Sequence, residues 1–360
     1  MASSKERVSV LVIGSMPPPV GGVTIHIKRL FEKAVTDERV DLEVLDLKNR
    51  VLYTPSSTES GIRSAVSAFF KAEIIHIQIS NVAKIAIALL SFVFGKKVIY
   101  THHNSRPERK VFASILGLSC RYIVLVNDSV RKCFDFPGKV VLIPAFIPPV
   151  SEEVLRDDVS RDIEKFDVVL AVNAYDKNYI DGKEVYGIDL LCDAIAELSR
   201  AIRGGEKQPY AGHVGVFFFD PSGAYAGLGA QPANAEDAIS LRRYQGKNLS
   251  FYELLKVSDL CLRPTRTDGD PLSIREALHL GVKVLASDVT SRPEGVELFS
   301  SGDCRDFADK LDLILRRVGD DRQEIEGDGH YSLFYEQIVD LYRCCLGADG
   351  PGRTDSGIRD

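Results

Sequence analysis

The 360-residue sequence lacks the features that mark membrane-spanning, secreted and metal-binding proteins. Its nearest approach to a membrane span is the ten-residue apolar run 85–94, about half the length that a span requires. Its seven cysteines are scattered without metal-ligand spacing, a pattern typical of reduced cytosolic thiols. The first apolar run is short and leads directly into a Gly/Pro loop, so we expect no signal peptide. These absences predict a cytoplasmic protein.

An excess of positive charge and a dinucleotide motif are also missing. The net charge of −6 argues against broad nucleic-acid binding. No G-x-G-x-x-G motif is present, so we expect no nicotinamide cofactor. Hydrophobic residues make up 45% and charged residues 27%, which is typical of globular proteins, and the length is sufficient for two α/β domains.

Short apolar runs alternate with amphipathic segments along the chain, an order that predicts parallel sheets covered by helices. We expect strands at 8–13, 40–47, 74–79, 97–101, 122–127, 140–143, 167–172, 214–219, 260–263 and 282–287. We expect helices after residue 22 and at 61–70, 85–94, 187–203, 235–244, 271–280, 306–317 and 331–346. The sequence therefore predicts an α/β protein with two doubly wound parallel sheets.

The most informative stretch runs from Pro264 to Asp288 and has the pattern of a loop, a helix, a tight turn and a buried strand. Asp270 before Pro271 is typical of a helix start, because an Asp side chain can accept hydrogen bonds from first-turn amides. Asp268 lies in the loop before this helix, and Glu276 lies within it. Both carboxylates can therefore face the place where a strand ends and a helix begins, which is where open α/β sheets bind ligands.

This stretch resembles the acid, seven residues, acid motif of retaining glycosyltransferases of family four, with Asp268 where Glu is usual. In that family the second acid binds the ribose of the nucleotide, while the first acid and its loop contact the donor sugar. The resemblance implies that Glu276 is the ribose ligand and Asp268 the catalytic-site sugar contact. It also places in the donor-binding loop Gly269, Asp270, Pro271 and Leu272. For an isolated acid such as Glu276, capping of a surface helix would be the alternative.

The resemblance also implies the B-type glycosyltransferase fold, in which two Rossmann-like domains face a cleft. We expect an N-terminal acceptor-side domain at 1–148 and a C-terminal nucleotide-sugar donor domain at 149–330. A helix at 331–346 would return to the first domain. Residues 347–360 are rich in Gly, Asp and Arg, so we expect a disordered tail.

Two sites in the first half match the family less specifically. Gly21 and Gly22 follow the first strand, where they can let the backbone approach a ligand beside the free N–H groups of a helix start. A plain tight connection is the alternative. His103 matches a family histidine that contacts the donor sugar, although a lone histidine is often structural. His102 should face the other way, because side chains alternate along a strand.

The two cations that hold the diphosphate in the family are missing. Gly-Arg and Lys-Gly are usual, but Ala174-Tyr175 and Tyr186-Gly187 stand in those places. The replacement that we favour is Lys183, because the following helix start would place it beside the phosphates. Arg263 is the second candidate, and Lys177 and Arg266 are others. An ordinary solvated lysine is the alternative for each lysine.

The combined reading predicts a retaining transferase that moves a sugar from a nucleoside diphosphate sugar to a carbohydrate or lipid-linked acceptor, in bacterial surface polysaccharide assembly. We expect no metal and no cofactor, although Asp268-Gly269-Asp270 also spells the Asp-x-Asp of metal-dependent transferases. Two alternatives remain open, a nucleotide-sugar 2-epimerase of the same fold and a non-catalytic sugar-nucleotide-binding partner in an assembly complex. The run 85–94 can touch the inner face of a membrane peripherally, with a buried helix as the alternative.

Overall fold

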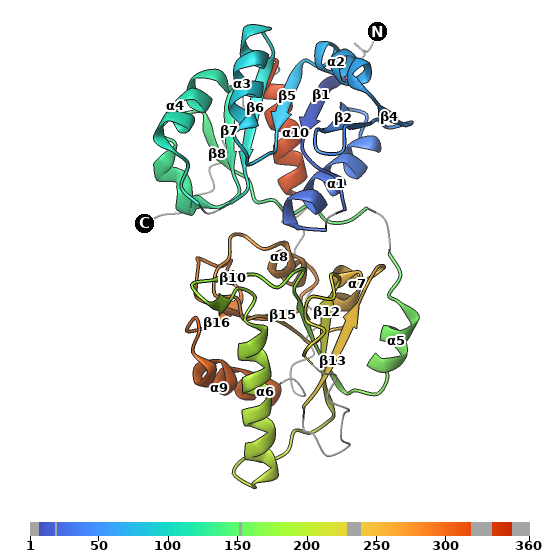
Figure 1. Cartoon of the computed structure of the whole chain (residues 1–360), viewed down its shortest axis with the longest axis vertical. Helices are drawn as coiled ribbons and strands as arrows, with labels where there is room; N and C mark the ends of the chain where they lie inside the picture. Colours follow the sequence, from blue (N-terminus) through green and yellow to red (C-terminus); the bar gives the residue numbers. More distant parts are fainter. Residues whose placement is uncertain are drawn as a thin grey trace. The chain divides into compact units, whose positions relative to one another are not determined.

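The computed structural model describes residues 7–18, 20–104, 106–150, 153–228, 239–317 and 333–347. The chain forms two compact units (Figure 1). The first unit runs to Val150 and includes the C-terminal helix α10 (Leu333–Cys345), and the second runs from Ser151 to Gly329. The predicted disordered tail, 347–360, lies outside the described residues apart from Gly347.

In the described ranges, the sheet of the first unit has eight strands in the order β4-β3-β2-β1-β5-β6-β7-β8. The parallel strands are β1 (Val8–Ile13), β2 (Val40–Asp46), β5 (Ile74–Ile77), β6 (Lys97–His102), β7 (Tyr122–Leu125) and β8 (Val140–Leu142). The antiparallel strands β3 (Val51–Tyr53) and β4 (Thr58–Ser60) extend one edge, and they were not predicted because three residues carry no readable period. The strand order changes direction beside β1, which lies between β2 and β5.

Helices cover both faces of this sheet. Three of them pack on one face through a shared core, namely α2 (Ile62–Lys71), α3 (Ala83–Val93) and α4 (Lys110–Ser119). Helix α10 packs on the opposite face, where Tyr342 Oη lies 2.7 Å from His76 Nδ1. Helix α1 (Gly22–Val35) follows β1, and a 3₁₀ helix, η1 (Asp128–Cys133), follows β7. Among the helices in the described ranges, none combines the length and apolarity needed to span a membrane.

The sheet of the second unit has six strands in its described part, all parallel, in the order β13-β12-β9-β14-β15-β16. They are β9 (Val168–Asn173), β12 (Val214–Asp220), β13 (Ile239–Gln245), β14 (Leu260–Arg263), β15 (Lys283–Ser287) and β16 (Val296–Phe299). Counted within this unit, the order is the 3-2-1-4-5-6 of nucleotide-binding Rossmann sheets. The strand order therefore reverses between β9 and β14: β12 and β13 extend the sheet on one side of β9, and β14, β15 and β16 extend it on the other.

Two helix layers enclose this second sheet. One face is covered by α6 (Ile188–Arg203) and α9 (Cys304–Leu315), and the other by α5 (Asp157–Ile163), α7 (Phe251–Lys256) and α8 (Leu272–His279). The loop between β9 and α6 carries a small hairpin, β10 (Tyr179–Ile180) with β11 (Lys183–Glu184).

One predicted helix is wrong. Residues 239–244 of the segment predicted as helix 235–244 lie in β13, which pairs in parallel with β12 from Ile239 to Gln245. Residues 235–238 lie outside the described residues. The segment contains the helix formers Ala, Leu and Arg, but every residue of β12 is buried and needs a backbone partner. Long-range pairing therefore outweighs local helix propensity here. The other predicted strands and helices are confirmed, with ends that differ by a few residues.

Candidate functional site

The predicted acidic stretch lies where the strand order of the second unit changes direction. Asn173 ends β9 and Arg263 ends the adjacent strand β14. The helices that follow these two strands, α6 and α8, cover opposite faces of the sheet. Such a switch point at the carboxyl ends of parallel strands is the ligand-binding position of open α/β sheets. The loop 264–271 and the start of α8 occupy this position.

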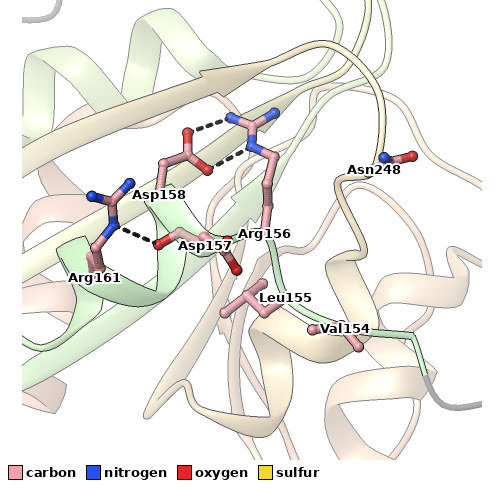
Figure 2. Close-up of a pocket in the computed structure, with 7 residues that line it drawn as sticks. All are labelled: Val154, Leu155, Arg156, Asp157, Asp158, Arg161 and Asn248. Carbon is pink, nitrogen blue, oxygen red and sulfur yellow. Dashed lines mark hydrogen bonds and ion pairs between the residues drawn. The ribbon is translucent and has the colours of Figure 1, made fainter.

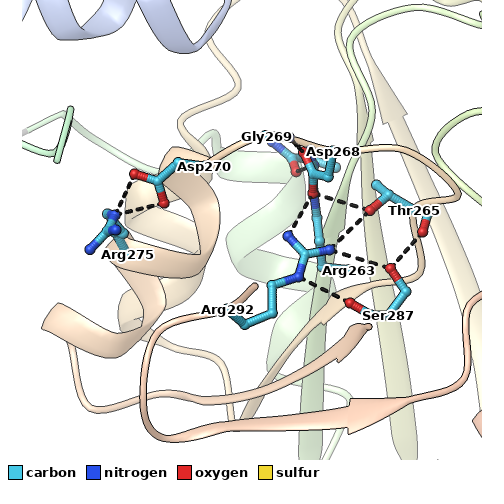
Figure 3. Close-up of polar contacts among 9 residues, drawn as sticks. Arg263, Thr265, Asp268, Gly269, Asp270, Arg275, Ser287 and Arg292 are labelled. Carbon is cyan, nitrogen blue, oxygen red and sulfur yellow. Dashed lines mark hydrogen bonds and ion pairs between the residues drawn. The ribbon is translucent and has the colours of Figure 1, made fainter. Parts of the chain in front are cut away.

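Asp268 is held by two arginines (Figure 3). Arg263 donates to its carboxylate from Nε at 3.0 Å and from Nη2 at 3.2 Å, and Arg292 donates from Nη1 at 3.0 Å. Thr265 Oγ1 adds a hydrogen bond of 3.1 Å. Burial raises the pKa of Asp268, but the charges of Arg263 and Arg292 outweigh this effect and bring the pKa below its usual value. Two guanidinium groups share one ionised carboxylate, so this cluster carries net positive charge.

Arg292 has no counterpart in the sequence-based predictions. It lies in the loop after β15, and its side chain is only 1% exposed. Its Nε donates to the carbonyl oxygen of Ser287 at 3.0 Å, which fixes the guanidinium at the end of β15. Because β14 and β15 are adjacent parallel strands, residues that follow both strands meet at one edge. The sequence signal that could have identified Arg292 is a basic residue in the loop after β15, the strand next to β14.

The predicted helix is confirmed, but the predicted capping role of Asp270 is wrong. Helix α8 begins at Leu272, and Pro271 holds the cap position without a side-chain cap. The Asp270 carboxylate instead accepts two bonds of 2.8 Å from Nε of Arg275. Charge-assisted pairing with an arginine is stronger than a bond to a neutral backbone amide, so the ion pair decides the position of this carboxylate. Burial raises the pKa of Asp270, against the opposing effect of Arg275.

Glu276 lies on α8, and its side chain is buried. Burial raises the pKa of Cys261 to about 12, and the negative charge of Glu276 adds to this rise after the opposing effect of Arg263. Glu276 therefore lies on the side of α8 that faces Cys261 of β14. Leu272 is buried as well, and Gly269 donates its backbone N–H to Asp268 at 3.1 Å. The predicted donor loop thus leads directly into the helix that carries Glu276.

An internal carboxylate occupies the start of α6, where the family places its Lys-Gly pair. Glu184 is buried and accepts from the backbone N–H groups of Tyr186 and Ile188, each at 2.7 Å, and from Tyr225 Oη at 2.6 Å. Gly187 has a φ of 69°, and a Cβ there would clash with the carbonyl oxygen of Pro264, so only glycine fits. These contacts join the start of α6 to the loop after β14.

The predicted replacement cations lie in different surroundings. Lys183 is exposed on β11, next to the buried Glu184 that accepts hydrogen bonds from the start of α6. Arg263 lies at the switch point, with its guanidinium 5.5 Å from the ring centroid of Tyr186. Arg266 is bound to Asp189 at 2.6 Å and to the Glu184 carbonyl at 2.9 Å. Lys177 lies over the rings of Tyr179 and Tyr225.

In the first unit, His103 lies beside the point where the strand order reverses. It follows β6, and its Nε2 donates to Oε1 of Gln78, which follows β5, at 2.9 Å. The ring of His26, on α1, lies edge-on to His103 at a centroid distance of 5.2 Å. Burial holds the pKa of His103 well below its usual 6.5, and the nearby His26 adds to this effect. His103 is therefore neutral at pH 7, with its proton on Nε2 and Nδ1 as an acceptor.

His102 faces a different environment from His103, as strand alternation predicts. Its Nδ1 lies 3.0 Å from Tyr100 Oη, and its Nε2 donates to the carbonyl oxygen of Arg106 at 3.1 Å. His102 is also fully buried. We therefore assign it to the packing of the loop after β6.

Gly21 and Gly22 form the start of α1. Gly21 is the cap residue with an extended backbone, and its N–H donates to Thr24 Oγ1 at 3.0 Å. A Cβ added to either glycine would meet no atom within 4 Å. The packing and backbone of the described chain therefore do not require glycine at these positions.

A pocket of about 630 Å³ lies elsewhere in the second unit (Figure 2). Arg156 is paired there with Asp158 at 2.6 Å, and Arg161 donates to the carbonyl oxygen of Asp157 at 3.2 Å. None of the residues predicted for the site lines this pocket. We assign it no role.

No protein-family model and no curated protein sequence matches this chain. Solved structures do match. Sucrose-phosphate synthase from Thermosynechococcus elongatus superposes with a TM-score of 0.61 at 14% identity, over 95% of this chain and 100% of that one. The catalytic domain of starch synthase IV from Arabidopsis thaliana, bound to ADP and acarbose, gives 0.60 at 13% identity, over 95% and 99%. A Listeria monocytogenes protein proposed to be a UDP-N-acetylglucosamine 2-epimerase gives 0.56 at 13% identity, over 96% and 98%.

The chain has the B-type glycosyltransferase fold. The predicted fold class, two Rossmann-like α/β domains, is confirmed. Structures of this fold include both synthases and a protein proposed to be a 2-epimerase. The fold alone therefore does not distinguish a transferase from an epimerase. The described residues contain no group of three or more His, Cys, Asp or Glu that could hold a metal ion.

Proposed function

We propose that the protein is a retaining glycosyltransferase that moves a sugar from a nucleoside diphosphate sugar to a carbohydrate or lipid-linked acceptor. The observation that carries this proposal is the pair of arginines, Arg263 and Arg292, on Asp268 at the switch point of the second unit. Glu276, on the helix that follows, supplies a carboxylate for the ribose. We place the reaction in the cytoplasm, in bacterial surface polysaccharide assembly.

The reaction requires stabilisation of the departing diphosphate. The bond between the anomeric carbon and the diphosphate oxygen breaks, the acceptor oxygen bonds to that carbon on the same face, and the acceptor proton passes to the diphosphate. The transition state resembles an oxocarbenium ion, and negative charge grows on the leaving group. Fixed guanidinium groups in a buried site stabilise that charge strongly, because the local dielectric constant is low. Arg263 and Arg292 supply such groups.

The arginine pairs also support a reaction without a metal. Asp268 and Asp270 have separate guanidinium partners, so a divalent cation would have to displace Arg263, Arg292 and Arg275. We therefore assign the Asp-x-Asp sequence to loop structure. Turnover should be unchanged after exhaustive chelation, and a loss that Mn²⁺ or Mg²⁺ restores would contradict this assignment.

His103 should contact the donor sugar through its neutral ring, so His103→Ala should lower kcat by about tenfold or more, the worth of one or two hydrogen bonds. Nucleotide affinity should remain near that of the parent, because the base and phosphates lie elsewhere. The rate should not change around pH 6.5, since burial keeps the pKa of His103 well below that value. Steady-state kinetics and nucleotide titration test this, and a larger kcat effect from His102→Ala would contradict it.

Lys183 stays a predicted phosphate contact. Lys183→Ala should weaken binding of the nucleoside diphosphate by about threefold to tenfold, in a salt-dependent manner, because the side chain is exposed. Binding of the nucleoside should not change. Lys165→Ala, an exposed lysine before β9 and so at the opposite end of that strand from the site, is the control. Equal effects on both ligands would show that Lys183 is an ordinary surface lysine.

The 2-epimerase remains the second candidate, because the fold also occurs in a protein proposed to be one. The purified protein should be incubated with UDP-, GDP- and ADP-sugars, with and without a glycan acceptor, and the free nucleotide measured. A transferase releases nucleoside diphosphate in step with glycoside formation. Conversion of the donor sugar without glycoside formation would identify an epimerase, and no reaction would favour a non-catalytic binding partner.

A further inference from the structure

Strand β5 and the residue after it place two polar side chains on the α10 side of the first sheet. Ile75 and Ile77 pack into one core with residues of α2, α3 and α4. His76 and Gln78 alternate with them and so face the opposite side of the sheet, where His76 contacts Tyr342 of α10. His76 and Gln78 are only 1% and 2% exposed. Polar side chains buried this deeply need hydrogen-bond partners.

Their partners form a chain of hydrogen bonds that runs from α10 to His103. Tyr342 Oη lies 2.7 Å from His76 Nδ1, and Thr101 Oγ1 lies 2.7 Å from His76 Nε2. Gln78 Nε2 lies 3.5 Å from His76 Nδ1, and Gln78 Oε1 lies 2.9 Å from His103 Nε2. The chain thus joins the C-terminal helix to the predicted sugar contact.

The two histidines of this chain are neutral at pH 7. Burial lowers the pKa of His76 to about 3 and holds the pKa of His103 well below 6.5. A neutral imidazole has one ring proton, so one of its nitrogens donates and the other accepts. The partners of each ring therefore decide which nitrogen has the proton.

Gln78 sets the direction of the chain. The hydroxyl groups of Tyr342 and Thr101 can donate or accept, so they permit either tautomer of His76. An amide oxygen only accepts, so Gln78 Oε1 requires the proton of His103 to be on Nε2. An amide N–H only donates, so Gln78 Nε2 requires His76 Nδ1 to be an acceptor. One amide group thus determines the tautomers of both histidines.

We propose that Gln78 is a positioning residue that keeps the proton of His103 on Nε2 and leaves Nδ1 as a hydrogen-bond acceptor for a ligand. A group that faces Nδ1 must then donate, which a sugar hydroxyl can do and a phosphate or ionised carboxylate cannot. A buried polar network whose members are all bonded holds one arrangement. The contact of His103 with a sugar rests on the proposed function, whereas the tautomer of His103 does not.

The test is the protonation of each ring nitrogen, read from long-range ¹H–¹⁵N spectra of the full chain with ¹⁵N-labelled histidine. Signals are assigned by their absence from His76→Gln and His103→Ala. In the parent at pH 7, His76 and His103 should each have a protonated Nε2 and an unprotonated Nδ1. Gln78→Met keeps a similar volume but removes the amide, so His103 should become a mixture of both tautomers. Gln78→Glu should keep the proton on Nε2 of His103, because a carboxyl oxygen can still accept it.

The matched control is Tyr100→Phe. Like Tyr342, Tyr100 is a buried tyrosine whose Oη lies beside a histidine Nδ1, at 3.0 Å from His102, but it belongs to the core on the other side of the sheet. This variant should leave the signals of His76 and His103 unchanged. The proposal is overturned if the parent His103 has its proton on Nδ1, or if Gln78→Met keeps that proton on Nε2 alone. It is also overturned if Tyr100→Phe changes the tautomer of His103 as much as Gln78→Met does.

The kinetic counterpart separates this proposal from the proposed function. Gln78→Met should lower kcat by about twofold to tenfold at unchanged nucleotide affinity, because only a fraction of the molecules then has the competent tautomer. If Gln78→Met changes the tautomer but not kcat, while His103→Ala lowers kcat, the positioning role is wrong and the proposed function stands. The spectra need no donor sugar, so absence of transfer by the parent would count against the proposed function alone.

Discussion

Arg292→Met should lower the rate of sugar transfer by about a hundredfold or more, the typical effect of removing a fixed donor from a developing anion. The Arg292 guanidinium is buried and bonded to Asp268, Thr265 and Ser287. Methionine retains most of the side-chain volume but removes the charge. Binding of the nucleoside diphosphate should weaken strongly, while binding of the nucleoside should change little. Initial rates and titration calorimetry measure these effects.

Arg275→Met is the matched control for this experiment. It also removes an arginine that is paired with an aspartate of the same loop, since Arg275 bonds Asp270 at 2.8 Å. If loss of any ion pair in this loop loosened the site, both variants would be impaired equally. Equal losses of rate in the two variants would therefore contradict a direct role for Arg292. Unfolding curves of both variants show whether the second unit remains folded.

Glu276→Gln should weaken nucleoside binding by about 1.5 to 3 kcal/mol, the worth of a hydrogen bond to a charged acceptor. The substitution keeps the shape of the side chain and removes its charge. The sharpest readout is a cycle with the matching deoxynucleoside, which lacks a ribose hydroxyl. The parent should prefer the ribonucleoside, and Glu276→Gln should lose most of that preference. A preference that survives the substitution would remove Glu276 from the ribose site.

The central part of the second unit was predictable from the sequence because its signals are local. Apolar runs give β14 and β15, and the apolar spacing of Leu272, Ala277 and Leu278 gives α8 between them. The acidic motif then indicated that its loop, 264–271, follows the end of a strand. Strand β13 was missed because its pairing with β12 is a long-range contact that local propensity does not contain.

The contacts that define the candidate site were less predictable. Arg292 lies 24 residues from Asp268, and the two meet only because β14 and β15 are adjacent. Glu184 reaches Tyr225 across 41 residues to complete the cap of α6. Asp270 could either cap the start of α8 or pair with Arg275, and both contacts are local. The spacing of the residues did not decide between them, and the structure shows the pair with Arg275.

The most direct test of the account is a comparison of nucleoside diphosphates with their nucleosides on the purified parent protein. Thermal shift with UDP, GDP and ADP, and with uridine, guanosine and adenosine, reads out binding without a known acceptor. One diphosphate at 100 times its dissociation constant should add about 2.7 kcal/mol of stability, and its nucleoside should add clearly less at the same concentration. Arg292→Met should abolish that difference. If no diphosphate stabilises the protein more than its nucleoside does, the two arginines on Asp268 do not form a diphosphate site.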